Sequence, residues 1–125
     1  MPENDPRDDY AYEITVQTGW QRGAGTTADV YIQLIGTLGE SDPRNAKDPK
    51  RPKFKRAAVD QFLLTVPQSL GDLKELYIWH NNSGDSPAWY LFRVLIRDMQ
   101  TSQHWWFVCD KWLAVDEDDG KVKYH

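Results

Sequence analysis

The chain has 125 residues, a length typical of one domain, and carries a net charge of −4. Six tryptophans, six tyrosines and four phenylalanines supply large side chains for a buried core. No apolar run approaches the roughly 20 residues that a bilayer-spanning helix needs. The polar residues 1–11 lack the apolar stretch of a signal peptide. These features exclude a membrane-spanning helix within this sequence and predict a soluble domain.

Cysteine and histidine content narrows the chemistry further. The single cysteine, Cys109, excludes a disulfide within the domain, which suits a reducing compartment. With His80, His104 and His125 it lacks the compact spacing of a zinc site. Nucleic-acid binding is not expected, because the domain is acidic and its basic run contains one stacking aromatic, Phe54.

In chain order, the first predicted element is a disordered N-terminal tail over residues 1–10, followed by one domain over residues 11–125. Five segments of the domain alternate apolar and polar residues with period two, as β-strands do: residues 12–17, 30–35, 61–66, 76–79 and 105–109. Residues 91–96 form a denser apolar run, which predicts a buried strand. A weak last strand is expected around Val122 and Tyr124.

Turn residues separate these strands at residues 36–43, 67–71 and 82–84. No segment shows a helical period over eleven or more residues. We therefore predict an all-β, antiparallel β-sandwich of two roughly four-stranded sheets. Residues 39–52 are charged and punctuated by proline, which predicts a surface loop. Trp79, Trp89 and Trp112 are expected in the core, whereas Trp106 alternates with inward-facing neighbours and should face outward.

Basic residues concentrate between Arg44 and Arg56. This segment holds seven basic residues and one acid, so it carries +6 while the rest of the chain carries −10. A surface patch of this kind attracts anionic surfaces. The alternative is a solvated loop whose lysines only maintain solubility. The candidate contacts to anionic lipid in this segment are Lys47, Lys50, Arg51, Lys53, Lys55 and Arg56.

A glycine-rich loop formally matches a nucleotide-binding pattern. Residues 23–28 fit G-x-G-x-x-G/A, but that motif needs a helix N-terminus after the loop to hold a pyrophosphate. Val30, Ile32 and Leu34 alternate as a strand instead, which excludes this reading. The G-x-S-x-G, Walker and H-E-x-x-H signatures are also absent, so no enzyme activity is predicted.

The same loop and several later motifs resemble the PLAT (lipoxygenase-homology, LH2) domain family. They fall in the family's order over about residues 10–120: Thr18-Gly19, Gly25-Thr26, Asp60-Gln61-Phe62, Pro87-Ala88-Trp89 and Trp112-Leu113. Gly39-Glu40-Ser41 and Trp79-His80 make the chain most similar to the polycystin-1 group. The resemblance implies a PLAT/C2-like sandwich and a place on the cytoplasmic side of a multi-pass membrane protein.

The resemblance also implies docking on anionic phospholipids, such as phosphatidylserine and phosphoinositides, and on a regulatory protein. Trp20 lies in a polar loop with no alternation to bury it, so we expect it to enter the headgroup region, with Arg22 contacting phosphate. The alternative is that Trp20 folds back as a satellite core residue. Two alternatives stay open. One is a protein-interaction module that uses these loops or Trp106; the other is an accessory domain of a lipase or lipoxygenase. The isolated domain is expected to be a monomer.

Calcium is the remaining question, because PLAT domains often bind it through their loops. Ca²⁺ takes six to eight oxygen ligands, several of them charged. Here Thr27, Asn81 and Ala88 stand where many relatives carry Asp. We therefore expect no required cofactor, and either a weak calcium site or an ordinary asparagine turn. The weak site would use Gly25, Thr27, Asn81, Asn82 and Asp85.

Overall fold

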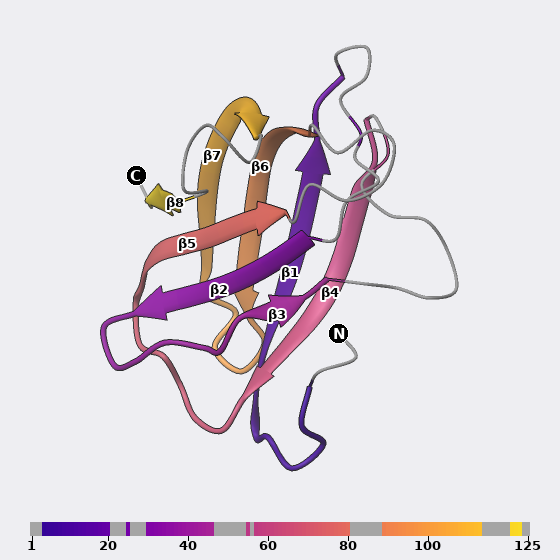
Figure 1. Cartoon of the computed structure of the whole chain (residues 1–125). Helices are drawn as coiled ribbons and strands as arrows, with labels where there is room; N and C mark the ends of the chain where they lie inside the picture. The colour runs from indigo at the N-terminus through magenta and orange to yellow at the C-terminus, as the bar shows by residue number, and fades with distance from the viewer. Residues whose placement is uncertain are drawn as a thin grey trace.

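The chain folds as two antiparallel four-stranded sheets that face each other (Figure 1). The computed structural model describes residues 4–20, 25, 30–46, 55, 57–80, 89–113 and 121–123, with the backbone alone for residues 80, 111–113 and 121–123. The first sheet has the order β4-β1-β6-β7, made of β4 (Val59–Val66), β1 (Tyr10–Thr18), β6 (Trp89–Asp98) and β7 (His104–Leu113). The second has the order β3-β2-β5-β8, made of β3 (Arg44–Asn45), β2 (Val30–Gly36), β5 (Leu73–His80) and β8 (Lys121–Lys123). The predicted all-β sandwich is confirmed.

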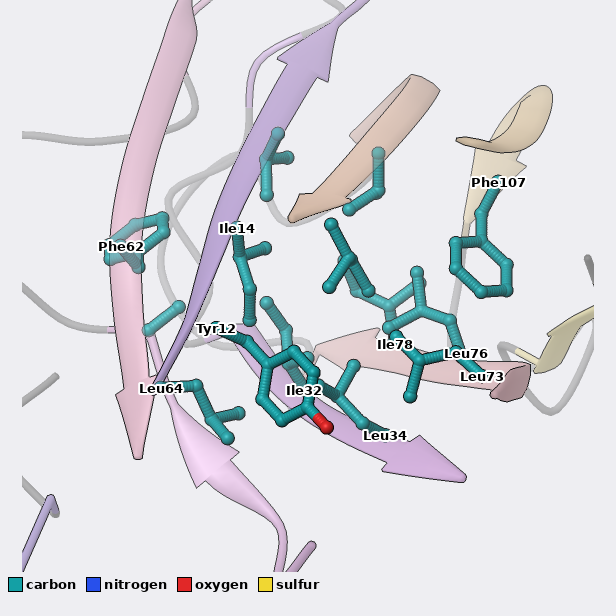
Figure 2. Packing of buried hydrophobic residues seen from close by; sticks show 14 of the residues in the cluster. Tyr12, Ile14, Ile32, Leu34, Phe62, Leu64, Leu73, Leu76, Ile78 and Phe107 are labelled. Atoms are coloured by element: carbon teal, nitrogen blue, oxygen red, sulfur yellow. The ribbon is translucent and has the colours of Figure 1, made fainter. Parts of the chain in front are cut away.

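The core lies between the sheets and is filled by the inward residues of each alternating strand (Figure 2). On β1, Tyr12 and Ile14 are fully buried and pair in register with Leu64 and Phe62 of β4. Ile32 of the second sheet is also fully buried and faces this layer. Each such aliphatic side chain contributes roughly 1.5–3 kcal/mol through its removal from water. The period-two pattern in the sequence is therefore the direct cause of the two-layer structure.

Residues 39–52, predicted as a surface loop, partly form sheet structure, so that prediction is wrong in this part. The chain returns along β2, where Ser41 N donates to Leu34 O at 2.9 Å and Leu34 N donates to Ser41 Oγ at 3.0 Å. Arg44 then begins the short strand β3, and Ala46 N donates to Val30 O at 2.8 Å. A two-residue strand has no period to detect, so its pairing depends on the serine rather than on a hydrophobic pattern.

The N-terminal residues 4–9, part of the tail predicted to be disordered, lie along the open edge of β4. Asn4 Nδ2 donates to Leu63 O at 2.5 Å, and Thr65 N donates to Asn4 Oδ1 at 3.2 Å. Thr65 Oγ1 donates to Asp8 Oδ2 at 2.9 Å. These bonds pair groups of an edge strand that would otherwise be open to another chain. The disorder of residues 1–10 stays a prediction.

The tryptophans divide between the core and the outer faces. Trp89 is fully buried, as predicted. The core placement predicted for Trp79 is wrong: it lies half-buried and stacks on Tyr31, with ring centroids 5.8 Å apart. Ile78 faces inward, so its neighbour Trp79 must face outward. The side chain of Trp112 is outside the described part. No helix among the described residues is long and apolar enough to cross a bilayer.

Candidate functional site

Gly19 lies at the end of the sandwich where β1 stops and where β4 and β6 start. Hydrogen bonds hold its backbone from both sides. Gly19 N donates to Tyr90 O at 2.9 Å, and Ala57 N donates to Gly19 O at 2.8 Å. Thr18 N donates to Ala58 O at 3.0 Å. The peptide groups on both sides of Gly19 are thus tied to β6 and to the turn before β4. The next residue, Trp20, therefore leaves the sheet from a fixed point.

The described turn before β4 is fixed as well. Ala58 N donates to Lys55 O at 3.0 Å, and Ala57 adopts a φ of 59°. A left-handed conformation at a residue with a Cβ costs roughly 1–2 kcal/mol, so the surrounding hydrogen bonds must maintain it. The turn places the exposed Lys55 at the same end of the domain as Trp20.

Trp20 is 72% exposed, which confirms the exposure predicted from the sequence. Its role in lipid binding stays a prediction, as does that of Lys55. Arg44 does not belong to an exposed patch: it is 8% exposed, and its Nη1 donates to Asn4 Oδ1 at 2.9 Å. The other candidate lipid contacts lie outside the described residues: Arg22, Lys47, Lys50, Arg51, Lys53 and Arg56.

The candidate calcium site is described at one position, Gly25, which is half-buried. Thr27, Asn81, Asn82 and Asp85 lie outside the described residues. Among the residues that the structure describes, no group of three or more His, Cys, Asp or Glu side chains is arranged to hold a metal ion. The proposed set contains a single carboxylate, and calcium affinity falls as the number of charged ligands falls. This donor set fits a weak site.

Arg93 and Trp106 pack together on the outer face of the first sheet. The sequence indicated the outward position of Trp106 but not its partner. Trp106 faces outward as predicted, and the Arg93 guanidinium carbon lies 4.4 Å from its ring centroid. Arg93 Nε also donates to Gln17 Oε1 at 2.5 Å. Arg93 pairs with Val108 in the β6–β7 register, two positions along from Trp106. Sequence reasoning missed Arg93 because only the register shows which β6 residue lies beside Trp106.

Tyr90 lies near the Trp20 end and is held by β7. Its hydroxyl donates to the backbone oxygen and to Oδ1 of Asp110, both at 2.9 Å. The bond to the Asp110 carboxylate raises the pKa of Tyr90 above its ordinary value, and burial adds to the effect. The phenol therefore stays neutral at physiological pH and acts as a structural donor.

A pocket of about 300 Å³ lies at the opposite end of the sandwich, between the β2–β3 and β4–β5 connections. Its wall includes the acids Glu40 and Asp42 beside the buried Arg44. Opposite charges on one wall favour neither anions nor cations. The pocket therefore identifies no ligand class by its electrostatics.

Sequence comparison places these features in a known family. Residues 12–124 match the PLAT/LH2 domain. Polycystin-1-like protein 3 of Mus musculus is 48% identical over 116 residues, which cover 93% of this chain and 5% of the relative. Polycystin-1 of Homo sapiens is 42% identical over 107 residues, covering 86% of this chain and 2% of the relative. The chain thus spans a small part of the length of these relatives.

Solved structures agree on the fold. A coral 8R-lipoxygenase, described as activated by calcium via a C2-like domain, superposes with a TM-score of 0.79 at 22% identity, covering 91% of this chain and 16% of the enzyme. A calcium-dependent 11R-lipoxygenase superposes with a TM-score of 0.66 at 28% identity, covering 92% of this chain and 17% of the enzyme. The lipoxygenase catalytic domain is not present in these 125 residues. By its family match and its polycystin relatives, the chain belongs to the PLAT/LH2 domain family.

Proposed function

We propose that this domain is a non-catalytic membrane-docking and regulatory module that binds anionic phospholipid. In this proposal it belongs to a polycystin-1-like, multi-pass membrane protein and acts at the cytoplasmic face. The observation that carries the proposal is the position of Trp20. This residue is 72% exposed and directly follows Gly19, whose backbone is held by hydrogen bonds to Tyr90 and Ala57 (the Gly19 clamp). An exposed tryptophan in this position presents the type of side chain that is enriched at membrane–water interfaces.

The chemistry of the indole ring supports a membrane interface. Tryptophan combines an apolar body with one N–H donor, and it is enriched at the headgroup level of bilayers for that reason. The hydrogen bonds of Gly19 hold the base of the Trp20 loop before any contact is made. Less backbone freedom is then lost on docking, which favours binding.

The basic segment supplies the electrostatic part of the proposal. Each Lys or Arg near an anionic membrane contributes roughly 1 kcal/mol, so three engaged residues would strengthen binding roughly 150-fold. The whole domain carries −4, so an anionic surface would repel it at any other orientation. The basic segment and Trp20 together would therefore select both the lipid charge and the orientation. A covalent link to a membrane span would raise the local concentration further.

Co-sedimentation with vesicles tests this function. We expect the domain to sediment with vesicles that contain phosphatidylserine or phosphoinositides and to stay in solution with phosphatidylcholine alone. Trp20→Ala should abolish most of the binding. Leu38→Ala is the matched control, because Leu38 is also 72% exposed but lies on the connection after β2, which packs against Leu70 at the other end of the domain.

Two further measurements, at higher salt and with basic residues replaced, test the electrostatic part of binding. Raising NaCl from 0.1 to 0.5 M shortens the Debye length to under half and should release the domain. Replacing Lys50, Arg51 and Lys53 with Gln should have the same effect. Binding that is equal for neutral and anionic vesicles, or that survives Trp20→Ala, would overturn this function.

Protein binding is the second candidate function. The Arg93–Trp106 pair favours it, because Trp and Arg are the residue types most enriched at binding hot spots.

A further inference from the structure

The outer face of the first sheet is a continuous surface across four strands. The strand registers place its residues in rows, of which two are central: Val59, Gln17, Arg93 and Val108 in one, and Gln61, Thr15, Leu95 and Trp106 in the next. We call these eight residues the outer-face rows. Their inward neighbours Val16, Val94 and Phe107 are fully buried, so the rows must face away from the core.

Apolar side chains are exposed on both sides of this surface. Val59 is 60% exposed on β4, and Val108 is 54% exposed on β7. Leu63, 43% exposed, continues the apolar edge of β4. Single exposed aliphatic residues are ordinary on protein surfaces. Here they flank an Arg–Trp pair on one face, and this composition is typical of protein interfaces.

Arg93 is the charged centre of the surface. Its guanidinium lies over Trp106 and donates to the neutral amide of Gln17. Within the part of the chain that the structure describes, no carboxylate lies within ion-pair distance of it. The neighbouring Arg97 instead lies 3.7 Å from Glu13, as Nε to Oε1. Arg93 is therefore pre-positioned by Trp106 and Gln17, and no carboxylate of the described residues neutralises its charge.

We propose that the outer-face rows bind an acidic, apolar segment of a protein partner. An Asp or Glu of that segment accepts hydrogen bonds from Arg93 in the fork geometry that suits a carboxylate. Aliphatic or aromatic side chains flanking the acid pack on Trp106 and Val108. The amides of Gln17 and Gln61 exchange hydrogen bonds with the backbone or polar groups of the segment.

The same rows fit a lipid surface or a second copy less well. Gln17 and Gln61 would lose their hydrogen bonds to water against acyl chains, which costs free energy unless new partners replace them. In a symmetric dimer, Arg93 would meet this same face again, on which the acid beside it, Glu13, already pairs with Arg97. A partner segment with its own acid resolves both problems.

The proposed protein contact and the proposed membrane contact use different surfaces of the domain. Trp20 lies beyond the end of β1, whereas Arg93 and Trp106 lie within β6 and β7, on the outer face of the first sheet. Strands in a sheet are about 4.8 Å apart, so four strands present a width of roughly 20 Å, enough for one helix or a strand pair. The face is therefore suited to a segment rather than to a whole domain.

Selection of a random dodecamer peptide library against the complete domain tests the proposal. We expect the selected peptides to be net acidic, with Leu, Phe or Trp beside the acid. Affinities of the synthesised peptides are then measured for the domain and its variants by calorimetry. Trp106→Ala should weaken binding roughly 30-fold, as loss of a hot-spot side chain does, and Arg93→Gln should weaken it at least ten-fold.

Matched controls keep the result specific. Trp79→Ala removes a half-buried tryptophan from the outer face of the other sheet, and Arg97→Gln removes the neighbouring arginine; both should keep binding within about two-fold. If circular dichroism shows that Trp106→Ala is unfolded, the affinity of Arg93→Gln for the peptides still tests the proposal. The proposal is overturned by basic or purely apolar peptides, by peptides that bind Trp106→Ala and Arg93→Gln normally, or by no binders. Loss of vesicle binding or of dimers on Trp106→Ala would assign the face to lipid or to self-association instead.

Discussion

The indole Nε1 of Trp89 donates a hydrogen bond of 2.9 Å to Oγ1 of Thr18, and both residues are buried. This bond joins the last residue of β1 to the first residue of β6, directly below the clamp on Gly19. It therefore supports the base from which Trp20 leaves the sheet. A buried indole donor needs such an acceptor, because an unpaired one costs about 1–3 kcal/mol.

Thr18→Val tests this support. The variant keeps the shape of the side chain but removes the acceptor, so Trp89 loses its partner and the free energy of unfolding should fall by about 1–3 kcal/mol. Urea denaturation followed by fluorescence measures the change. Thr101→Val on an exposed turn is the control and should change stability by less than about 0.5 kcal/mol. An equal effect of both substitutions would contradict the role given to Thr18.

Asp98 predicts an acid-dependent component of stability. Its side chain is buried and accepts hydrogen bonds from the hydroxyl of Tyr10 and from the backbone N–H groups of Gln100 and Thr101. Burial alone raises the pKa of Asp98, but the hydrogen bonds of Tyr10 and Gln100 outweigh it and lower the pKa below its ordinary value. The contribution of Asp98 is then present above the unfolded pKa and is lost as pH falls through the folded pKa.

Asp98→Asn should therefore destabilise the domain by about 1–3 kcal/mol at pH 6 and by less at pH 2 to 3. Chemical denaturation of both proteins across this pH range provides the measurement. Asp42→Asn, at an exposed position, is the control. A stability difference that stays constant from pH 6 to pH 2 would show that the carboxylate charge is not what Asp98 contributes.

Gly36→Ala should be destabilising because the chain passes too closely at this point. A Cβ on residue 36 would lie 2.1 Å from the backbone oxygen of Leu70, which also accepts a hydrogen bond from Leu38 N. Relieving the clash requires the connection before β5 to move, at a cost of about 1–3 kcal/mol. Gly39→Ala is the control, since nothing lies within 4 Å of its Cβ position. Thermal unfolding should show a lowered Tm for the first variant only.

Much of the fold was predictable because it depends on period-two alternation. Tyr12, Ile14 and Val16 are buried as the pattern indicates, and the same holds for Val30, Ile32 and Leu34. Strand β3 was not predictable, because two residues carry no period and their pairing follows from Ser41. Trp79 was wrongly expected in the core because of its size. Its neighbour Ile78 is buried, and the alternation of the strand therefore turns Trp79 outward.

The candidate site divides in the same way. The exposure of Trp20 followed from its polar, glycine-rich surroundings, in which no alternation buries it. The hydrogen bonds that hold Gly19 could not be predicted from the sequence, because they join it to residues 57 and 90, which are far away in the chain. The Arg93–Trp106 pair also required the register of β6 and β7, which shifts between Leu91 and Arg93 and does not follow from counting residues.

Calcium should have a small effect on this domain. With one carboxylate in the proposed ligand set, Kd should be of the order of 1 mM or weaker, and 10 mM Ca²⁺ then stabilises the fold by at most about 1.4 kcal/mol. Unfolding in 10 mM CaCl₂ and in 10 mM MgCl₂ separates a specific site from ionic strength. Asp85→Asn should remove any specific stabilisation. A stabilisation by calcium above about 3 kcal/mol would contradict the weak site.

The central claim is that Trp20 is the residue that enters the membrane, and NMR of the six tryptophan indole N–H groups tests it most directly. The ¹⁵N-labelled domain is mixed with nanodiscs that contain phosphatidylserine and a paramagnetic lipid, with neutral nanodiscs as the reference. The account predicts that the Trp20 indole signal broadens with the anionic discs, while the buried Trp89 and the outer-face Trp106 keep theirs. An unchanged Trp20 signal, or broadening of Trp106 in its place, would contradict it.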